Sequence, residues 1–225
     1  MFAYGWPHSL VISSGFILNY IDRFMLANLL QDTASVAYYD AAYMIIGSIL
    51  GLMIRPFNLF LFPAYSKKFI TEGGPKTIVF IEKLQRTFLF ALLIAACLVL
   101  ITQEVIMDYI FPANFFISHS LIPFLAVGLL FNGVYISSMA GLYIEKKTKL
   151  IALASLFGII INVLLNYILI PTYGAEGAAI GTSLGFVSCL IIGSYFAKRS
   201  LAVKAPFYQL FLSVFVIFLL LFVTS

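Results

Sequence analysis

The sequence predicts an all-α transmembrane protein, a polytopic bundle of about seven membrane-spanning helices. Its 225 residues are 63% hydrophobic and only 10% charged, whereas a soluble domain carries about 25% charged residues. The mean hydropathy is +1.08, and several apolar runs reach about 20 residues, the length that an α-helix needs to cross a hydrocarbon core. A chain of this composition cannot cover its surface with polar groups. Soluble enzymes, nucleic-acid-binding proteins and disulfide-stabilised scaffolds are therefore excluded.

The predicted spans follow one another with short connections that leave no room for a soluble domain. Four of the six connections contain residues that end or start helices, namely Gly73, Gly74, Pro75, Pro112, Pro171, Gly174 and Pro206. The seven predicted spans cover 9–29, 38–63, 84–102, 119–143, 150–170, 176–197 and 207–223.

Lys and Arg alternate between the connections. The connections after the first, third and fifth spans contain neither residue, whereas those after the second, fourth and sixth contain Lys67, Lys68, Lys76, Lys146, Lys147, Lys149, Lys198, Arg199 and Lys204. Basic loops stay in the cytoplasm, so we expect a cytoplasmic N-terminus and an external C-terminus. The formal charge of +4 then reflects topology, and no nucleic-acid partner is expected.

Two arginines lie inside predicted spans, in the company of acidic residues. Arg23 and Asp22 belong to the first span, and Arg55 and Asp40 to the second. A charge at the bilayer centre costs about 2.5–3.5 kcal/mol on insertion scales, so such side chains usually face a protein interior or a wet cavity.

Helical geometry places these charges on polar stripes. At 100° per residue, Asp40, Tyr43, Gly47, Gly51, Arg55 and Asn58 share one stripe of the second span. Asn19, Asp22 and Arg23 share the first span, which suggests helices arranged around a hydrophilic interior. We expect the substrate-binding residues of this cavity to be Arg55, Arg23, Asp22, Asn19 and Asn58.

A purely structural role is the alternative for each of these positions. Asp22 and Arg23 diverge by about 100°, so each could pair with another helix and lock the bundle, and for Asp40 this interpretation is preferred. Intramembrane asparagines often join helices by hydrogen bonds, so Asn162 and Asn166 are predicted to be structural. Close helix packing is expected from the repeated small residues Gly177, Gly181 and Gly185. Pro56 is expected to kink the second span.

Signatures of enzymes are missing from the sequence. It has no phosphate-binding loop, no HExxH and no paired acidic motif at a cytoplasmic helix end. The two histidines, His8 and His119, fall at opposite membrane faces and cannot share a metal. We therefore expect no catalytic residues, no metal and no cofactor, and transport driven by a gradient.

Several stretches match one family of membrane proteins in the right order. Residues 162–182 contain N..LN..LIP.YG..GAA..T, and shorter matches lie at 4–23 (YG.P…ILN..DR), 63–67 (P.Y.K) and 141–149 (GLY..KKTK). Together they resemble the second half of polysaccharide flippases of the multidrug/oligosaccharidyl-lipid/polysaccharide exporter superfamily. The resemblance implies an inner-membrane flippase for lipid-linked sugars, such as O-antigen or capsule units on a polyprenyl diphosphate.

Members of that family resemble two six-helix lobes around a central cavity. The chain resembles the second lobe over 1–205, followed by an additional helix over 206–225. The resemblance therefore implies a partner, either an N-terminal lobe or a second copy, besides the polyprenyl-diphosphate-linked sugar and membrane lipid. The alternatives are half of a cation-coupled multidrug exporter, a membrane enzyme acting on polyprenyl-linked sugars, and a non-transporting membrane remnant.

Overall fold

The computed structural model describes the backbone of residues 2–224, and the side chains of all of these except 2–8, 10–12, 15, 19, 113, 114, 116, 117, 223 and 224. The described chain is helical and contains no strand. Its elements are α1 (Phe2–Leu30), α2 (Thr33–Glu72), α3 (Gly74–Ile110), the 3-10 helix η1 (Ala113–Leu121), α4 (Ile122–Ser138), α5 (Ala140–Ile144), α6 (Thr148–Ala197) and α7 (Phe207–Thr224).

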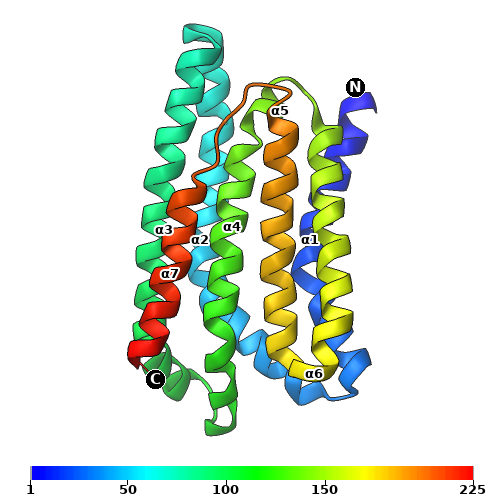
Figure 1. Cartoon of the computed structure of the whole chain (residues 1–225), viewed down its shortest axis with the longest axis vertical. Coiled ribbons are helices and arrows are strands. Elements are labelled where there is room, and N and C mark those ends of the chain that lie inside the picture. The colour runs from blue at the N-terminus through cyan, green and yellow to red at the C-terminus, as the bar shows by residue number, and fades with distance from the viewer. Residues whose placement is uncertain (1, 225) are drawn as a thin grey trace.

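The predicted all-α transmembrane bundle is confirmed. Four helical segments are long and apolar enough to cross a membrane, namely α2, α3, Ser118–Ile144 and α6, and α7 contributes a shorter apolar helix at Phe207–Phe222. The helices run along the long axis of the molecule, side by side (Figure 1). The division of the chain into 1–205 and 206–225 stays a prediction.

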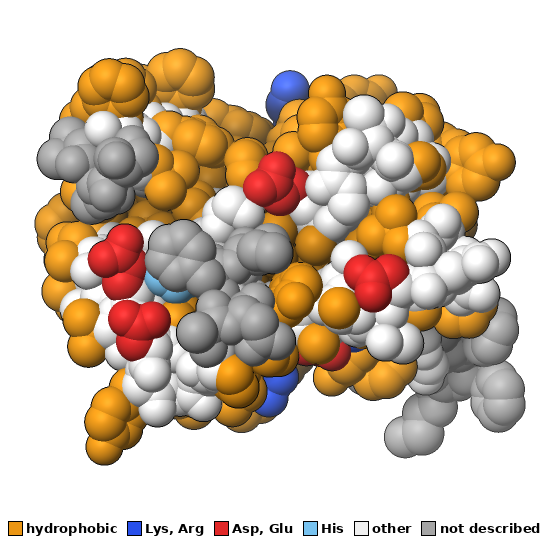
Figure 2. Space-filling view, turned by 90° about the horizontal axis from the view of Figure 1, so that it is seen from below, with side chains coloured by type: hydrophobic (Ala, Val, Ile, Leu, Met, Phe, Trp, Pro, Cys, Tyr) orange, Lys and Arg blue, Asp and Glu red, His pale blue; other side chains and the backbone are white. Residues whose placement is uncertain are grey.

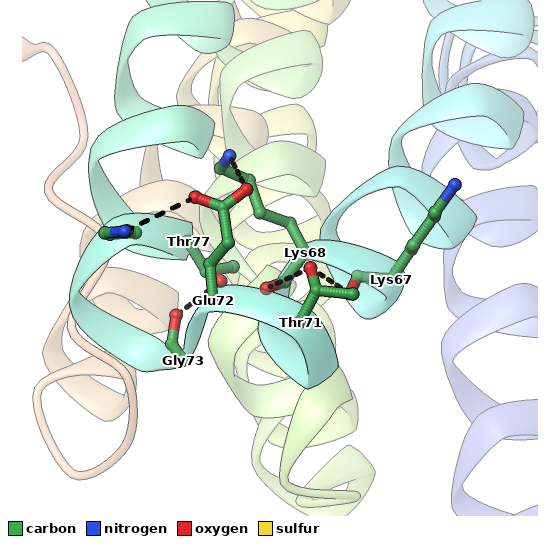
Figure 3. A network of polar contacts seen from close by, with 7 residues as sticks. Lys67, Lys68, Thr71, Glu72, Gly73 and Thr77 are labelled. Carbon is green, nitrogen blue, oxygen red and sulfur yellow. Dashed lines mark hydrogen bonds and ion pairs between the residues drawn. The ribbon is translucent and has the colours of Figure 1, made fainter.

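Two helices extend well beyond the predicted spans. α2 and α3 have 40 and 37 residues, because polar helix-forming residues continue each helix past the apolar run. Figure 3 shows the connection between them, where Lys68 Nζ lies 2.7 Å from a Glu72 carboxylate oxygen. Gly73 then ends α2 with a φ of 81°, in the region that glycine adopts without strain. Pro75 stands in the first turn of α3, where its missing N–H costs nothing.

α6 contains two predicted spans, because Gly174 reverses the chain with a φ of 57° and a ψ of −133°. Figure 1 shows the two resulting arms of α6, 148–173 and 175–197, lying side by side. The second arm presents its glycine ridge to the first. A Cβ at Gly177 would lie 2.5 Å from the carbonyl oxygen of Leu169, and a Cβ at Gly185 would lie 3.0 Å from the Cβ of Asn162. Larger residues would force the arms apart.

The two ends of the bundle differ in charge. The turn between α2 and α3, the turn before α6 and the segment before α7 meet at the upper end in Figure 1. We call it the basic end because it gathers Lys67, Lys68, Lys76, Lys146, Lys147, Lys149, Lys198, Arg199 and Lys204. Figure 2 looks onto the opposite, acidic end, where carboxylate side chains lie among apolar ones. This end holds Asp32, Glu104, Asp108 and Glu176.

The segment between α6 and α7 is held to the basic end by carboxylates. Glu145 accepts a hydrogen bond from the Leu201 backbone N–H at 3.2 Å, and Glu82 accepts one from the Lys204 backbone N–H at 2.9 Å. From there α7 descends along α3 and α4, as Figure 1 shows. The segment therefore attaches α7 to the other helices.

Candidate functional site

The centre of the helix packing contains a buried carboxylate. Asp22 of α1 is 0% exposed, and each of its two oxygens accepts two hydrogen bonds. Oδ1 receives the amide groups of Asn166 at 2.7 Å and Asn162 at 3.0 Å. Oδ2 receives the hydroxyl groups of Thr182 at 2.6 Å and Tyr39 at 2.9 Å. We call these five residues the Asp22 cluster.

The local sequence of α6 explains how this cluster forms. Asn162 and Asn166 stand one turn apart on the first arm, so their amides project from the same face. Gly181 of the second arm lies directly against the Asn166 side chain, where a Cβ would collide with Oδ1. The absence of a side chain at Gly181 therefore gives the Asn166 amide room to reach Asp22.

Four donors satisfy an ionised carboxylate fully, which is the condition for keeping one in an apolar interior. The cluster joins α1 to both arms of α6, and Tyr39 adds α2. Removing the carboxylate itself would leave four buried donors without their shared acceptor, which costs several kcal/mol.

Among metals, a hard cation of low charge is the kind that the oxygen atoms of the Asp22 cluster would suit. The described residues contain no group of three or more His, Cys, Asp and Glu side chains that could hold a metal ion. The Asp22 cluster offers one carboxylate with hydroxyl and amide oxygens, and Asn166 Oδ1 is buried without a hydrogen-bond partner. Oxygen ligands favour hard cations, and a single negative charge matches a monovalent one.

Arg23 neighbours Asp22 in sequence but has different partners. Its guanidinium forms an ion pair with Asp40 of α2, and the side chains of Arg23 and Asp40 are 18% and 50% exposed. The guanidinium carbon also lies 5.1, 5.4 and 4.8 Å from the ring centres of Tyr20, Tyr39 and Tyr43, which is within cation–π range. Tyr39 thus contacts Arg23 with its ring and Asp22 with its hydroxyl group.

Arg55 has a different environment. Its side chain is exposed, and it forms no hydrogen bond or ion pair within the described part of the chain. One turn away, Gly51 faces open space, with no atom within 4 Å of an added Cβ. Asn58, on the same stripe, has its Oδ1 buried without a hydrogen-bond partner. The stripe around Arg55 is therefore open and polar.

The predicted site residues do not form a single cluster. Asp40, the partner of Arg23, stands 15 positions before Arg55 on α2, which corresponds to about 22 Å along a helix. The Asn19 side chain lies outside the described residues. Asp22 is fully buried in this conformation, so its contact with substrate stays a prediction, as do those of Arg23, Arg55 and Asn58.

Sequence reasoning missed two members of the Asp22 cluster. Tyr39 precedes Asp40 and lies just outside the predicted stripe, and Thr182 appears only as the last residue of the 162–182 family pattern. Their hydroxyl groups meet 3.1 Å apart. No short-range signal could have joined them, because 143 positions separate them in the chain.

Comparisons with known proteins identify the family. Residues 2–224 match the model of the family described as "Lipid II flippase MurJ". The chain is 25% identical over 112 residues to the "Probable low-salt glycan biosynthesis flippase Agl15" of Haloferax volcanii, covering 50% of this chain and 24% of that protein. It is 26% identical over 208 residues to the "Uncharacterized membrane protein MJ1068" of Methanocaldococcus jannaschii, covering 89% of this chain and 39% of that protein.

The chain thus spans well under half the length of these two curated relatives. The expected likeness to flippases is confirmed at the level of the family. Because the match covers nearly every residue, the chain belongs to the lipid II flippase MurJ family.

Proposed function

We propose that the chain is one half of a flippase that moves lipid-linked oligosaccharides across the cytoplasmic membrane. The observation that carries the proposal is Arg55, an exposed arginine without a hydrogen-bonding partner on an open polar stripe of an apolar helix. The family match supports a lipid-linked substrate, and the Agl15 match supports a glycan. O-antigen or capsule units remain the more specific expectation.

The chemistry of Arg55 suits a diphosphate. A guanidinium binds phosphate oxygens through two parallel hydrogen bonds and stays charged at any depth in the membrane. Placing an arginine within a span costs about 2.5–3.5 kcal/mol, and no hydrogen bond or ion pair with another described residue offsets this cost for Arg55. An anionic head group would supply the missing counter-charge while its lipid tail stays in the bilayer.

The second half of the transporter would cover the face that carries Arg55. The chain corresponds to part of its relatives, so we propose that an N-terminal lobe or a second copy completes the cavity. In this arrangement the basic end faces the cytoplasm, in accord with the positive-inside rule.

The orientation is tested by labelling two single-cysteine variants with a thiol reagent that does not cross membranes. Lys147→Cys, at the basic end, should be labelled only from the cytoplasmic side, and Ala175→Cys, at the acidic end, only from outside. Labelling from the reverse sides would contradict the orientation.

Substitution of Arg55 in the complete, two-lobed transporter tests the proposed site. We expect Arg55→Ala to abolish export of the lipid-linked sugar at unchanged protein abundance, and Arg55→Lys to retain part of it, because the charge remains but the bidentate geometry is lost. Export is measured as surface glycan, and abundance as membrane-inserted protein.

Arg86→Ala is the matched control, since Arg86 is an exposed arginine of α3 outside the proposed site. It should export normally. Normal export by an abundant Arg55→Ala protein would reject the site. A fall in abundance with unchanged export per molecule would show that Arg55 is structural.

A further inference from the structure

The two intramembrane arginines differ in their counter-ions. Arg55 has no ion pair among the described residues, whereas Arg23 is paired with Asp40. The neighbouring Asp22 cannot serve Arg23 in the same way, because its oxygens already accept four hydrogen bonds from the other members of the Asp22 cluster. Asp40 is thus the carboxylate that forms an ion pair with Arg23.

The two arginines also differ in depth. Arg23 lies seven positions before the last residue of α1, and Asp40 seven positions after the first residue of α2. Both therefore stand about 10 Å from the acidic ends of their helices. Arg55 lies about 22 Å further along α2, toward the basic end. On the face formed by α1 and α2, Arg55 therefore lies in the interior without an ion pair. Arg23, which Asp40 neutralises, lies near the acidic end.

In this ion pair the carboxylate of Asp40 can move into solvent while the guanidinium of Arg23 keeps its position. The Asp40 side chain is half exposed, whereas that of Arg23 is mostly covered. Three tyrosine rings lie within cation–π distance of the guanidinium and hold it in addition to Asp40. An anion that approached Arg23 would therefore compete with Asp40 for a cation that is already in place.

We propose that Asp40 competes with an incoming anion for the guanidinium of Arg23. Asp40 thereby lowers the affinity of Arg23 for that anion. The proposal rests on the proposed function and extends it. Arg55 holds the diphosphate head group strongly, and Arg23 holds it weakly because Asp40 returns to the guanidinium. A weak binding site near the acidic end favours release of the head group there. Without Asp40, Arg23 becomes a second strong binding site.

The test measures binding of farnesyl diphosphate, a short prenyl diphosphate, to the full chain purified in detergent micelles. The Arg55→Gln substitution removes the strong binding site, so that binding measured in this background reports on Arg23. In that background we expect Asp40→Asn to tighten binding about two- to fivefold, the range of a partly exposed ion pair. Asp40→Ser should act likewise, and Asp40→Glu should leave affinity unchanged. Adding Arg23→Gln should abolish the gain.

Asp108→Asn is the matched control, because it removes an exposed carboxylate from the same end of the molecule, on α3. It should not change affinity. Unchanged or weaker binding by both neutral Asp40 variants would overturn the proposal, as would a gain that survives Arg23→Gln. Failure of both neutral variants to fold would also overturn it, since Asp40 would then be a structural brace.

The same experiment separates this proposal from the proposed function. If Arg55→Gln alone does not weaken binding of farnesyl diphosphate, the proposed diphosphate site at Arg55 is rejected. The effect of Asp40→Asn still reports on Arg23 in that case, because the comparison is made between variants that share the Arg55 substitution.

Discussion

The Asp22 cluster and the stripe around Arg55 contain the same class of residue, a charged side chain within a membrane-spanning helix, yet they differ in every physical respect. Asp22 is fully buried and accepts four hydrogen bonds from three other helical segments. Arg55 is exposed beside an open glycine and has no hydrogen-bond partner in the described chain. A satisfied charge holds a bundle together, whereas an unsatisfied one is available to a ligand.

Arg23 stands between these two cases. It is adjacent to Asp22 in sequence and faces Asp40 and three tyrosine rings in space. Tyr39 touches both groups, with its hydroxyl on Asp22 and its ring on Arg23. The side chain of Tyr39 therefore contacts both the Asp22 cluster and Arg23.

The largest expected effect comes from removing the carboxylate of the Asp22 cluster. Asp22→Ala leaves two amides and two hydroxyl groups without their acceptor, and we expect a loss of about 3–5 kcal/mol in stability. The yield of folded protein and its thermal unfolding in detergent measure this loss. Asp108→Ala, a change of an exposed carboxylate, should leave both unaltered. A folded Asp22→Ala protein of normal thermal stability would break the distinction between the two regions.

A smaller effect is expected from filling the space beside the cluster. Gly181→Ala places a Cβ against Asn166 Oδ1 and must push the arms of α6 apart, at a cost of about 1–3 kcal/mol. Gly51→Ala, on the stripe of Arg55, meets no atom within 4 Å and should stabilise the helix slightly. Thermal unfolding of the two variants compares the regions directly, and equal losses would contradict the comparison.

The smallest effect is expected at the side chain that joins the two regions. Tyr39→Phe keeps the ring beside Arg23 but removes the hydroxyl bond to Asp22, so stability should fall by about 1 kcal/mol. Tyr38→Phe, on a ring outside the Asp22 cluster, is the matched control for thermal unfolding. A loss as large as that of Asp22→Ala would contradict the expected order of effects.

The fold class and the positions of the intramembrane charges follow from the sequence alone. Apolar runs of bilayer length predict helices, and Arg23, Arg55, Asp22 and Asp40 stand out because charges within such runs are costly. The family resemblance was also readable from local patterns, because 162–182 preserves its spacing within one continuous segment.

The partners of those charges were decided only by the tertiary structure. Asp22 and Arg23 are adjacent, and nothing in their order says which of them turns inward. The choice depends on Asn162, Asn166 and Thr182, which stand 140, 144 and 160 positions from Asp22. Such contacts form only when Gly174 folds the arms of α6 together and α1 packs against both. Helix periodicity determines which side chains share a face, but packing determines which face meets which.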